Sequence, residues 1–453
     1  MKQLDFEHGT VTGNILGAAV PMLVAQILNL LYNIVDRIYI ARIPKVGTAA
    51  LGAVGLCFPL IVIITAFSNL YGSGGAPLFS IHRGKKETQA ANDIMNTSFS
   101  MLCLTGVILM VVGMLLIRPI LILFGASEGA LAYACPYMML YLIGTLPSMI
   151  AVGMNPFINA QGYSLTGMLS VAIGAAANLV LDPLFIFTLD MGTAGAALAT
   201  GLSQFISFCI LLWMCNHQDS CISISIRKFR PKLAIYREVL YGGIPSLGRQ
   251  GIASVATILM NFMCQPYGDA AIAAMSIVSR FMFFINSVII GFGQGFQPVC
   301  SYCFGAGLYD RVKKACWFCI RVSTIILLVL SVISFPAARS IITLFRRNDP
   351  TVIEIGTLAL RLQLITLPLQ GAVIMGNMMP QSIGYGFRAT LVSTARQGIF
   401  LIPLLTIMTY TIGLLGIQCA QPLADIATFI LSLFVIRGIF KEFPEDASSF
   451  AAQ

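Results

Sequence analysis

Apolar stretches follow one another along almost the whole chain, separated by short polar segments. A hydrocarbon core of about 30 Å needs roughly 20 residues to be crossed by an α-helix. About twelve stretches have this length, and they start near residues 14, 50, 92, 132, 161, 194, 236, 270, 314, 353, 386 and 414. The pattern predicts an all-α integral membrane protein with twelve transmembrane helices.

The composition agrees with this prediction. Hydrophobic residues make up 57% of the 453 residues and charged residues 10%, whereas an average soluble domain has roughly 25% charged residues. The N-terminal MKQLDFEHGTVTG is polar and mixed in charge, and the apolar stretch after it is longer than the hydrophobic part of a signal peptide. We therefore expect the first helix to stay in the protein.

Lysine and arginine collect in the loops that follow the second, sixth and eighth predicted helices. These residues are Arg83, Lys85, Lys86, Arg227, Lys228, Arg230, Lys232, Arg237, Arg311, Lys313 and Lys314. Such loops are usually cytoplasmic, so both termini are predicted to be cytoplasmic, although the first and ninth loops also contain basic residues. The net charge of +9 then reports topology, and no long basic domain is present that could hold a nucleic acid.

The two halves of the chain repeat one another at a shift of 221 residues. The shift takes Gly72, Gly74, Pro77, Ser80 and Gly84 to Gly293, Gly295, Pro298, Ser301 and Gly305, Thr145-Leu146-Pro147 to Thr366-Leu367-Pro368, and Gly192 and Gly195 to Gly413 and Gly416. We predict two pseudo-symmetric six-helix lobes, residues 1–216 and 236–440, around a central cleft, with a basic cytoplasmic linker at 217–235 and a polar tail at 441–453. Such a pair of lobes suits a transporter that works by alternating access.

Common energy sources other than an ion gradient leave no motif in the sequence. No Walker pattern G-x4-G-K-[ST] occurs, since Gly84-Lys85-Lys86 lacks the hydroxyl residue. GFGQGF fails as a dinucleotide fingerprint and instead indicates close packing of small residues at a helix end. Ion coupling remains, and it requires ionisable groups inside the membrane.

The stretch QILNLLYNIVDRIYI places a carboxylate inside the first predicted helix. Its polar residues recur at spacings of three and four, which puts Gln26, Asn29, Asn33 and Asp36 on one helix face, with Tyr32 one turn from Asp36. Charged groups in hydrocarbon are rare and usually functional. Two roles remain open for the neighbouring Arg37: it pairs with Asp36, or it extends to the membrane surface as an anchor.

The fifth predicted helix supplies a second acid in NLVLDPLF. Asn178 and Asp182 lie four residues apart on one face, and Pro183 loosens the following turn. Carboxylate, amide and hydroxyl oxygens suit Na+ or a shared proton, because two nearby carboxylates in a poorly solvated cavity cannot both stay charged without a cation. An organic cation would compete for the same acids, which predicts antiport. Alternatively, Asp182 is a solvated helix end at the outer interface.

Twelve cysteines are present, mostly in apolar stretches. Cys300-x2-Cys303 and Cys316-x2-Cys319 have the pair spacing of a zinc ribbon. The sequence between them, FGAGLYDRVKKA, is an ordinary basic loop, and the chain has only three His. We expect these cysteines to pack as small apolar residues and predict no structural metal.

These residues resemble the multidrug and toxic compound extrusion (MATE) family of transporters over nearly the whole chain. The shared features are Pro21 and its counterpart Pro245, Asp36, the QG after the fourth helix, GFGQGFQP in the eighth helix, and Arg280 in SRFMFF. The last three are most similar to the MepA branch of the bacterial members.

The resemblance implies a cation site in the N-terminal lobe, formed by Asp36, Tyr32, Asn155, Asn178, Asp182 and Thr200. It implies Na+ or H+ coupling without an organic cofactor, and export of cationic amphipathic drugs from a bacterial inner membrane by a monomer embedded in the bilayer. Some members place further acids in helices seven and ten, where this chain offers Arg249, Gln363 and Gln370, so we expect no coupling through a C-terminal acid. Arg249, Arg280 and Arg396 make this lobe basic, either as polar residues of the cleft or as helix-end anchors.

Other functions are compatible with parts of the pattern. A flippase for a lipid-linked sugar in the same superfamily usually has extra helices. A membrane enzyme would need a nucleophile or metal at the membrane surface, and a passive channel would not respond to an opposing ion gradient. A major-facilitator carrier would show G-x3-D-R-x-G-R-[RK] in its second loop, which YGSGGAPLFSIHRGKK lacks.

Overall fold

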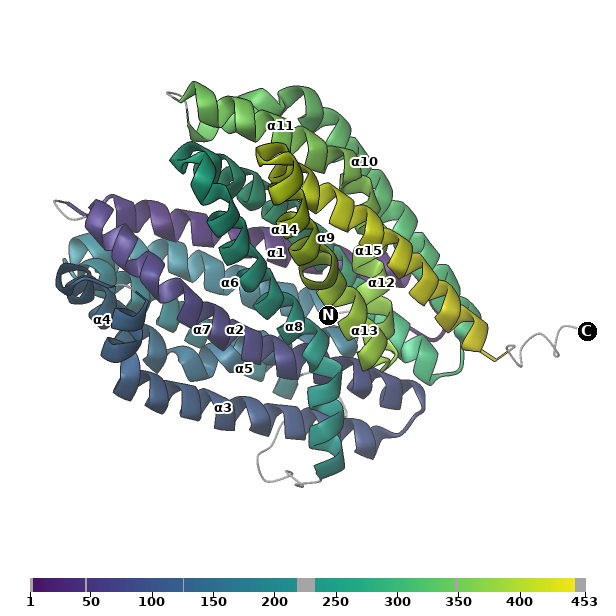
Figure 1. Ribbon diagram of the computed structural model, residues 1–453. Helices are drawn as coiled ribbons and strands as arrows, with labels where there is room; N and C mark the ends of the chain where they lie inside the picture. The colour runs from purple at the N-terminus through teal and green to yellow at the C-terminus, as the bar shows by residue number, and fades with distance from the viewer. Residues whose placement is uncertain (1–2, 45–46, 125, 218–232, 347–348, 445–453) are drawn as a thin grey trace, which may run out of the picture. The chain divides into compact units, whose positions relative to one another are not determined.

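The computed structural model describes residues 3–44, 47–124, 126–217, 233–346 and 349–444, and these residues are almost entirely helical (Figure 1). In chain order the elements are α1 (Val11–Ala41), α2 (Gly47–Gly84), α3 (Thr88–Leu123), α4 (Glu128–Ile143), α5 (Thr145–Ala160), α6 (Ser164–Pro183), η1 (Leu184–Thr188), α7 (Gly192–His217), α8 (Leu233–Cys264), η3 (Gln265–Tyr267), α9 (Asp269–Gly305), α10 (Tyr309–Phe345), α11 (Pro350–Thr366), η4 (Leu367–Leu369), α12 (Gln370–Ser382), α13 (Gly386–Thr394), η5 (Ala395–Phe400), α14 (Leu401–Ile412) and α15 (Leu414–Glu442).

The described helices confirm a multi-pass membrane protein. Ten helical stretches are long and apolar enough to cross a bilayer, and α4 and α5, bent by 56° with respect to each other, form an eleventh. The remaining predicted span is α8, whose 32 residues extend about 48 Å at 1.5 Å per residue. It is less apolar because Arg249 and Gln250 interrupt its hydrophobic stretch.

The chain forms two compact units that differ from the predicted lobes. Unit 1 contains residues 3–5 and 20–243, and unit 2 contains residues 6–19 and 244–444. The first part of α1 therefore belongs to unit 2, and the first part of α8 belongs to unit 1. Most of the predicted linker and tail, including Arg227, Lys228, Arg230 and Lys232, lies outside the described residues.

Repeated glycines explain this exchange of helix ends. A Cβ atom on Gly74 in α2 would lie 2.2 Å from the carbonyl oxygen of Val239 in α8, within unit 1. Its repeat partner, Gly295 in α9, would place a Cβ atom 2.2 Å from Cα of Ala19 in α1, within unit 2. The small residues that the sequence pattern identified are thus confirmed as sites of close helix packing.

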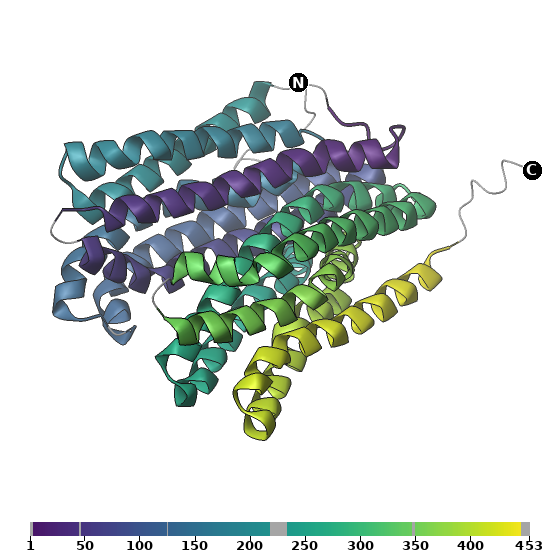
Figure 2. The same cartoon turned by 90° about the horizontal axis from the view of Figure 1, so that it is seen from above.

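Within each unit, neighbouring helices pack along their lengths. In unit 1, α2 contacts α3 and α5, and α6 contacts α7; in unit 2, α9 contacts α10 and α11, and α15 contacts α12 and α14 (Figure 1, Figure 2). Two π-helical segments, η1 and η5, interrupt the fifth helix of each half. Such segments often occur at functional sites, and η1 begins directly after Pro183, whose ring removes a backbone donor.

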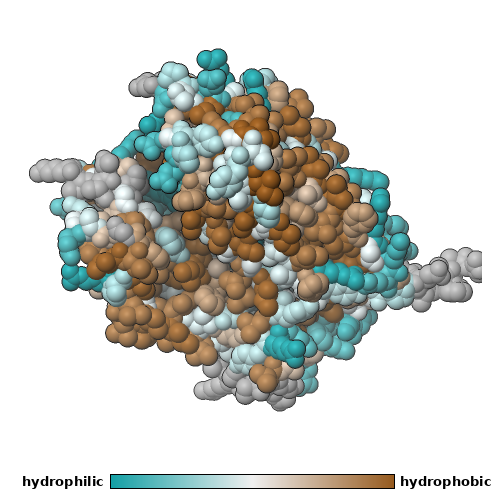
Figure 3. Space-filling view, in the orientation of Figure 1, coloured by the Kyte–Doolittle hydropathy of each residue, from teal (hydrophilic) through white to brown (hydrophobic). Residues whose placement is uncertain are grey.

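Apolar side chains cover much of the outer surface of α10 and α15 (Figure 3). On α10 these include Val332 and Ile333, which are 64% and 62% exposed, and on α15 Phe434 is 69% exposed. Large exposed apolar patches mark surfaces that contact lipid or a partner. On a protein with this many spanning helices, the surface contacts the lipid bilayer.

Candidate functional site

The polar stripe predicted on the first helix lies on α1 in unit 1. The amide Nδ2 of Asn33 donates to Oδ1 of Asn29 at 2.9 Å and to its carbonyl oxygen at 2.7 Å, so neighbouring members of the stripe contact each other. Gln26, Asn29 and Asp36 are half-buried. Oδ1 of Asp36 is buried and accepts no hydrogen bond.

The second acid lies at the end of α6, immediately before η1. Asp182 is fully buried and Asn178 is nearly so, and Nδ2 of Asn178 donates to Oδ1 of Asp182 at 3.2 Å. Oδ2 of Asp182 and Oδ1 of Asn178 are both buried without a hydrogen-bond partner. This burial excludes the alternative in which Asp182 is a solvated helix end.

Unit 1 brings the two acids near each other. Asp36 and Asp182 are close enough for their carboxylates to interact electrostatically. The Tyr32 hydroxyl lies near both acids and within hydrogen-bond reach of Gln204 on α7. Gln204 was not predicted, although it lies one turn after the half-buried Thr200, which the prediction did include.

The oxygen atoms of this site suit a small cation or a proton. Buried acceptors in proteins nearly always have a donor, yet one oxygen on each of Asp36, Asn178 and Asp182 has none. Carboxylate and amide oxygens are also the ligands that hard cations prefer. Within the described residues, no group of three or more His, Cys, Asp or Glu side chains is arranged to hold a metal ion, so a cation here would also depend on neutral oxygens.

Arg37 points away from this site. Its guanidinium lies over the Phe58 ring, 5.5 Å from the ring centroid, and its side chain is exposed. Oδ1 of Asp36 has no hydrogen-bond partner, which argues against a structural Asp36–Arg37 pair. The geometry favours the anchor role for Arg37.

Asn155 makes its hydrogen bonds elsewhere in unit 1. Its Nδ2 donates to the carbonyl oxygen of Gly167 at 3.1 Å and to Oγ of Ser170 at 3.4 Å. Ser170 lies about 12 Å along α6 from Asn178, at 1.5 Å per residue. In the second half, Nδ2 of Asn377 donates to the carbonyl oxygen of Ala389 at 2.8 Å. Both partners are shifted by 222 residues, so the two asparagines form equivalent ties between consecutive helices.

Unit 2 contains a buried acid that the sequence reasoning missed. Asp425 on α15 is fully buried, whereas no such C-terminal acid was expected because the search considered only helices seven and ten. Gln421 lies four residues before Asp425, as Asn178 lies four residues before Asp182, and this spacing could have revealed it. The repeat shift of 221 places Asp425 opposite Gln204 and Gln421 opposite Thr200.

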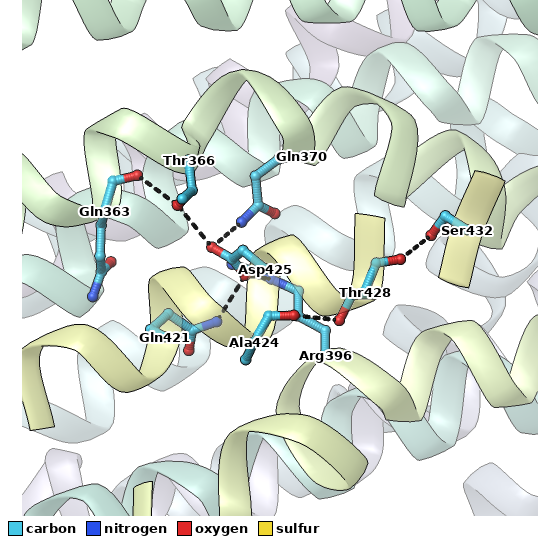
Figure 4. Close-up of polar contacts among 9 residues, drawn as sticks. All are labelled: Gln363, Thr366, Gln370, Arg396, Gln421, Ala424, Asp425, Thr428 and Ser432. Carbon is cyan, nitrogen blue, oxygen red and sulfur yellow. Dashed lines mark hydrogen bonds and ion pairs between the residues drawn. The ribbon is translucent and has the colours of Figure 1, made fainter. Parts of the chain in front are cut away.

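Four donors surround the Asp425 carboxylate (Figure 4). Oδ1 accepts from Nε of Arg396 at 2.8 Å and from Nε2 of Gln421 at 2.9 Å. Oδ2 accepts from Nε2 of Gln370 at 2.7 Å and, at 3.5 Å, from Oγ1 of Thr366. The carboxylate thereby joins α11, α12, η5 and α15.

The other basic candidates of unit 2 differ in their surroundings. Nη1 of Arg249, on α8, donates to Oδ1 of Asn377 at 3.3 Å, and its side chain is half-buried. Arg280 on α9 is exposed. Of the two cleft candidates in this half, only Arg249 is thus enclosed by protein.

The comparison with known families reflects the internal repeat. The MatE family model matches residues 21–184 and again residues 245–407, so that each match begins at one of the paired prolines. The chain belongs to the MatE family. The multidrug export protein MepA of Staphylococcus haemolyticus (strain JCSC1435) is 25% identical over 444 residues, which cover 98% of this chain and 97% of that protein. MepA of Staphylococcus aureus (strain MRSA252) is 24% identical over 433 residues, covering 95% and 94%.

Solved structures of MatE transporters share this fold. An outward-facing multidrug resistance MATE family transporter of the MOP superfamily superposes with a TM-score of 0.91 at 23% identity, covering 98% of this chain and 99% of that one. A MOP superfamily transporter from Pyrococcus furiosus, described as having a binding pocket of reverse polarity, gives a TM-score of 0.90 at 24% identity, covering 98% and 100%. The two-lobe architecture of twelve helices predicted from the sequence is thereby confirmed.

Proposed function

We propose that this MatE transporter exports cationic amphipathic drugs across a bacterial plasma membrane in exchange for Na+ or H+. Both termini would face the cytoplasm, and transport would proceed by alternating access. The names of the MepA relatives support the multidrug substrates. The observation that carries the coupling is the set of buried acceptor oxygens without donors on Asp36, Asn178 and Asp182.

The charge of the site supplies the mechanism. Two carboxylates lie in a membrane-embedded unit, and the nearest guanidinium in sequence, Arg37, is directed toward Phe58. Leaving a buried carboxylate without a partner costs several kcal/mol, so the site favours binding of a cation or a proton. A bound coupling ion reduces the negative charge that attracts an organic cation, and the reverse also holds. Mutual exclusion of the two ligands produces exchange.

Vesicle transport tests the proposal. Everted vesicles carrying Asp36→Asn or Asp182→Asn should lose gradient-driven uptake of a fluorescent cation by about tenfold or more, the effect of roughly 1.4 kcal/mol in coupling. Asp269→Asn, an exposed carboxylate at the start of α9, is the matched control and should behave as the parent. Separate Na+ and pH gradients identify the ion. Undiminished uptake by both variants would rule out this site.

A further inference from the structure

The carboxylate in unit 2 differs chemically from those in unit 1. Both oxygens of Asp425 already accept hydrogen bonds, from Arg396, Gln421 and Gln370 at 2.7 to 2.9 Å. A carboxylate with this many donors, one of them charged, needs no further cation. Asp425 is therefore placed to hold Arg396 and is not a second cation site.

Arg396 engages Asp425 through only one of its nitrogens. The bond uses Nε, because Gln370 and Thr366 occupy the other carboxylate oxygen. The side chain of Arg396 is 21% exposed, whereas that of Asp425 is 1% exposed. Its accessible end thus carries the terminal amino groups, which are well suited to bind a planar anion such as a carboxylate. A buried acid that fixes Nε orients this end and reduces the entropy lost on binding.

A second guanidinium comes from the segment that packs against η5. A Cβ atom on Gly248 would lie 3.4 Å from Cγ2 of Thr394, and one on Gly398 would lie 3.0 Å from Cγ2 of Ile252. Arg249 lies within this part of α8, and Arg396 lies within the facing part of η5. The two arginines therefore project from segments in van der Waals contact.

Arg249 is held by a neutral group alone. Its hydrogen bond runs to Oδ1 of Asn377, and Nδ2 of that amide is bound to the carbonyl oxygen of Ala389, which fixes the amide with its oxygen toward Arg249. No ion pair to Arg249 occurs within the described residues. A half-buried guanidinium without an acid is costly, and an anionic ligand would compensate it.

The charges in this part of unit 2 therefore leave a positive excess. Asp425 is the one buried carboxylate among the described residues of the unit, and it is paired with Arg396. Arg249 remains without a counter-charge. This arrangement favours a ligand that carries a negative group as well as an amphipathic body.

We propose that Arg249 and Arg396, the latter positioned by Asp425, form an anion-recognition site in unit 2 for the carboxylate of a zwitterionic amphipathic substrate. This inference rests on the proposed export function and narrows its substrate class. Arg249 and Arg396 contact the carboxylate, and Asp425 and Asn377 orient them. Binding is noncovalent, so no group is transferred.

A pair of dyes that differ at one carboxylate tests this site. Rhodamine 110 carries a free carboxylate, and rhodamine 123 is its methyl ester. Binding of each is measured by fluorescence polarisation to the full-length protein in phosphatidylcholine nanodiscs without an ion gradient. Arg249→Gln and Arg396→Gln should each weaken rhodamine 110 binding by about tenfold or more, since one charged hydrogen bond is lost, while binding of rhodamine 123 changes by less than about threefold.

The control is Arg361→Gln, which removes an exposed arginine of unit 2 on α11 and should change neither affinity. If Arg396→Gln does not fold, Arg396→Lys retains the charge without the planar fork and should weaken rhodamine 110 selectively. Equal losses for both dyes, no loss for either, or a parent that binds only the ester would overturn the site. Displacement of rhodamine 110 alone by added phosphatidylglycerol would assign it to a lipid phosphate instead.

The equilibrium readout separates this inference from the proposed function. A protein that binds both dyes as expected but shows no gradient-driven uptake would contradict antiport and leave the anion site intact. A protein that transports rhodamine 123 by antiport but ignores the carboxylate would contradict the anion site alone.

Discussion

Replacing Asp425 by alanine should destabilise unit 2 substantially. The substitution removes three hydrogen bonds of 2.7 to 2.9 Å and leaves Arg396 without its carboxylate. Removing one partner of a buried ion pair costs about 3 to 5 kcal/mol. Because the Arg396 side chain is 21% exposed and can regain water, we expect about 3 kcal/mol, the lower end of that range.

The expected loss is large enough to measure in purified protein. For a unit of about 200 residues, 3 kcal/mol corresponds to a decrease in Tm of about 6 to 12 °C. The assay heats detergent-solubilised protein in steps and measures the folded fraction by size-exclusion chromatography. Glu442→Gln is the control, since it breaks a more exposed ion pair, with Arg388, and should leave Tm within error.

A double variant separates the ion pair from the packing around it. Replacing both charged residues by apolar ones of similar size, Asp425→Leu with Arg396→Met, should recover most of the lost stability, because it leaves no buried charge unpaired. The reasoning is wrong if the double variant is as unstable as Asp425→Ala. It is also wrong if Asp425→Ala unfolds at the temperature of the parent.

Two further predictions concern helix packing. Gly74→Ala should destabilise unit 1 by about 1 to 3 kcal/mol, because the added methyl would meet backbone atoms of α8; Gly55→Ala on the same helix has open space and should be neutral or stabilising in the same thermal assay. Arg311→Ala should free the backbone of residues 6–9, whose carbonyl groups accept hydrogen bonds from Arg311. Hydrogen exchange of this segment should then rise while the rest of α10 stays protected, and unchanged exchange would contradict the tether.

The membrane fold was predictable because its main determinants are local. Apolar length identified the helices, and the repeat identified the two halves. Membership of each helix end in a unit was not predictable, since lipid is as apolar as a neighbouring helix and the hydrophobic pattern does not say which surface is covered. The exchange of residues 6–19 and of the start of α8 depends on close contacts at Gly74 and Gly295, which are visible only in three dimensions.

The candidate site was predictable where spacing alone defined it. Asn178 and Asp182 lie one turn apart on one helix, and the structure places their side chains in contact. Asn155 matched the family pattern by residue type, but its hydrogen bonds depend on the register between α5 and α6. Asp425 was missed because its partner Arg396 is 29 residues away on another helix, and pairing across helices leaves no periodic signal.

The shared ownership of α1 has a consequence for biosynthesis. The backbone of residues 6–9 leaves the ribosome about 300 residues before Arg311, to which it binds across separations of 302 to 305 residues. Unit 2 therefore cannot complete its packing until most of the chain has been made, and contacts this distant in sequence slow folding. A chain divided within residues 218–232 would separate both units from part of themselves, so the two fragments should each be incomplete alone and assemble only when produced together.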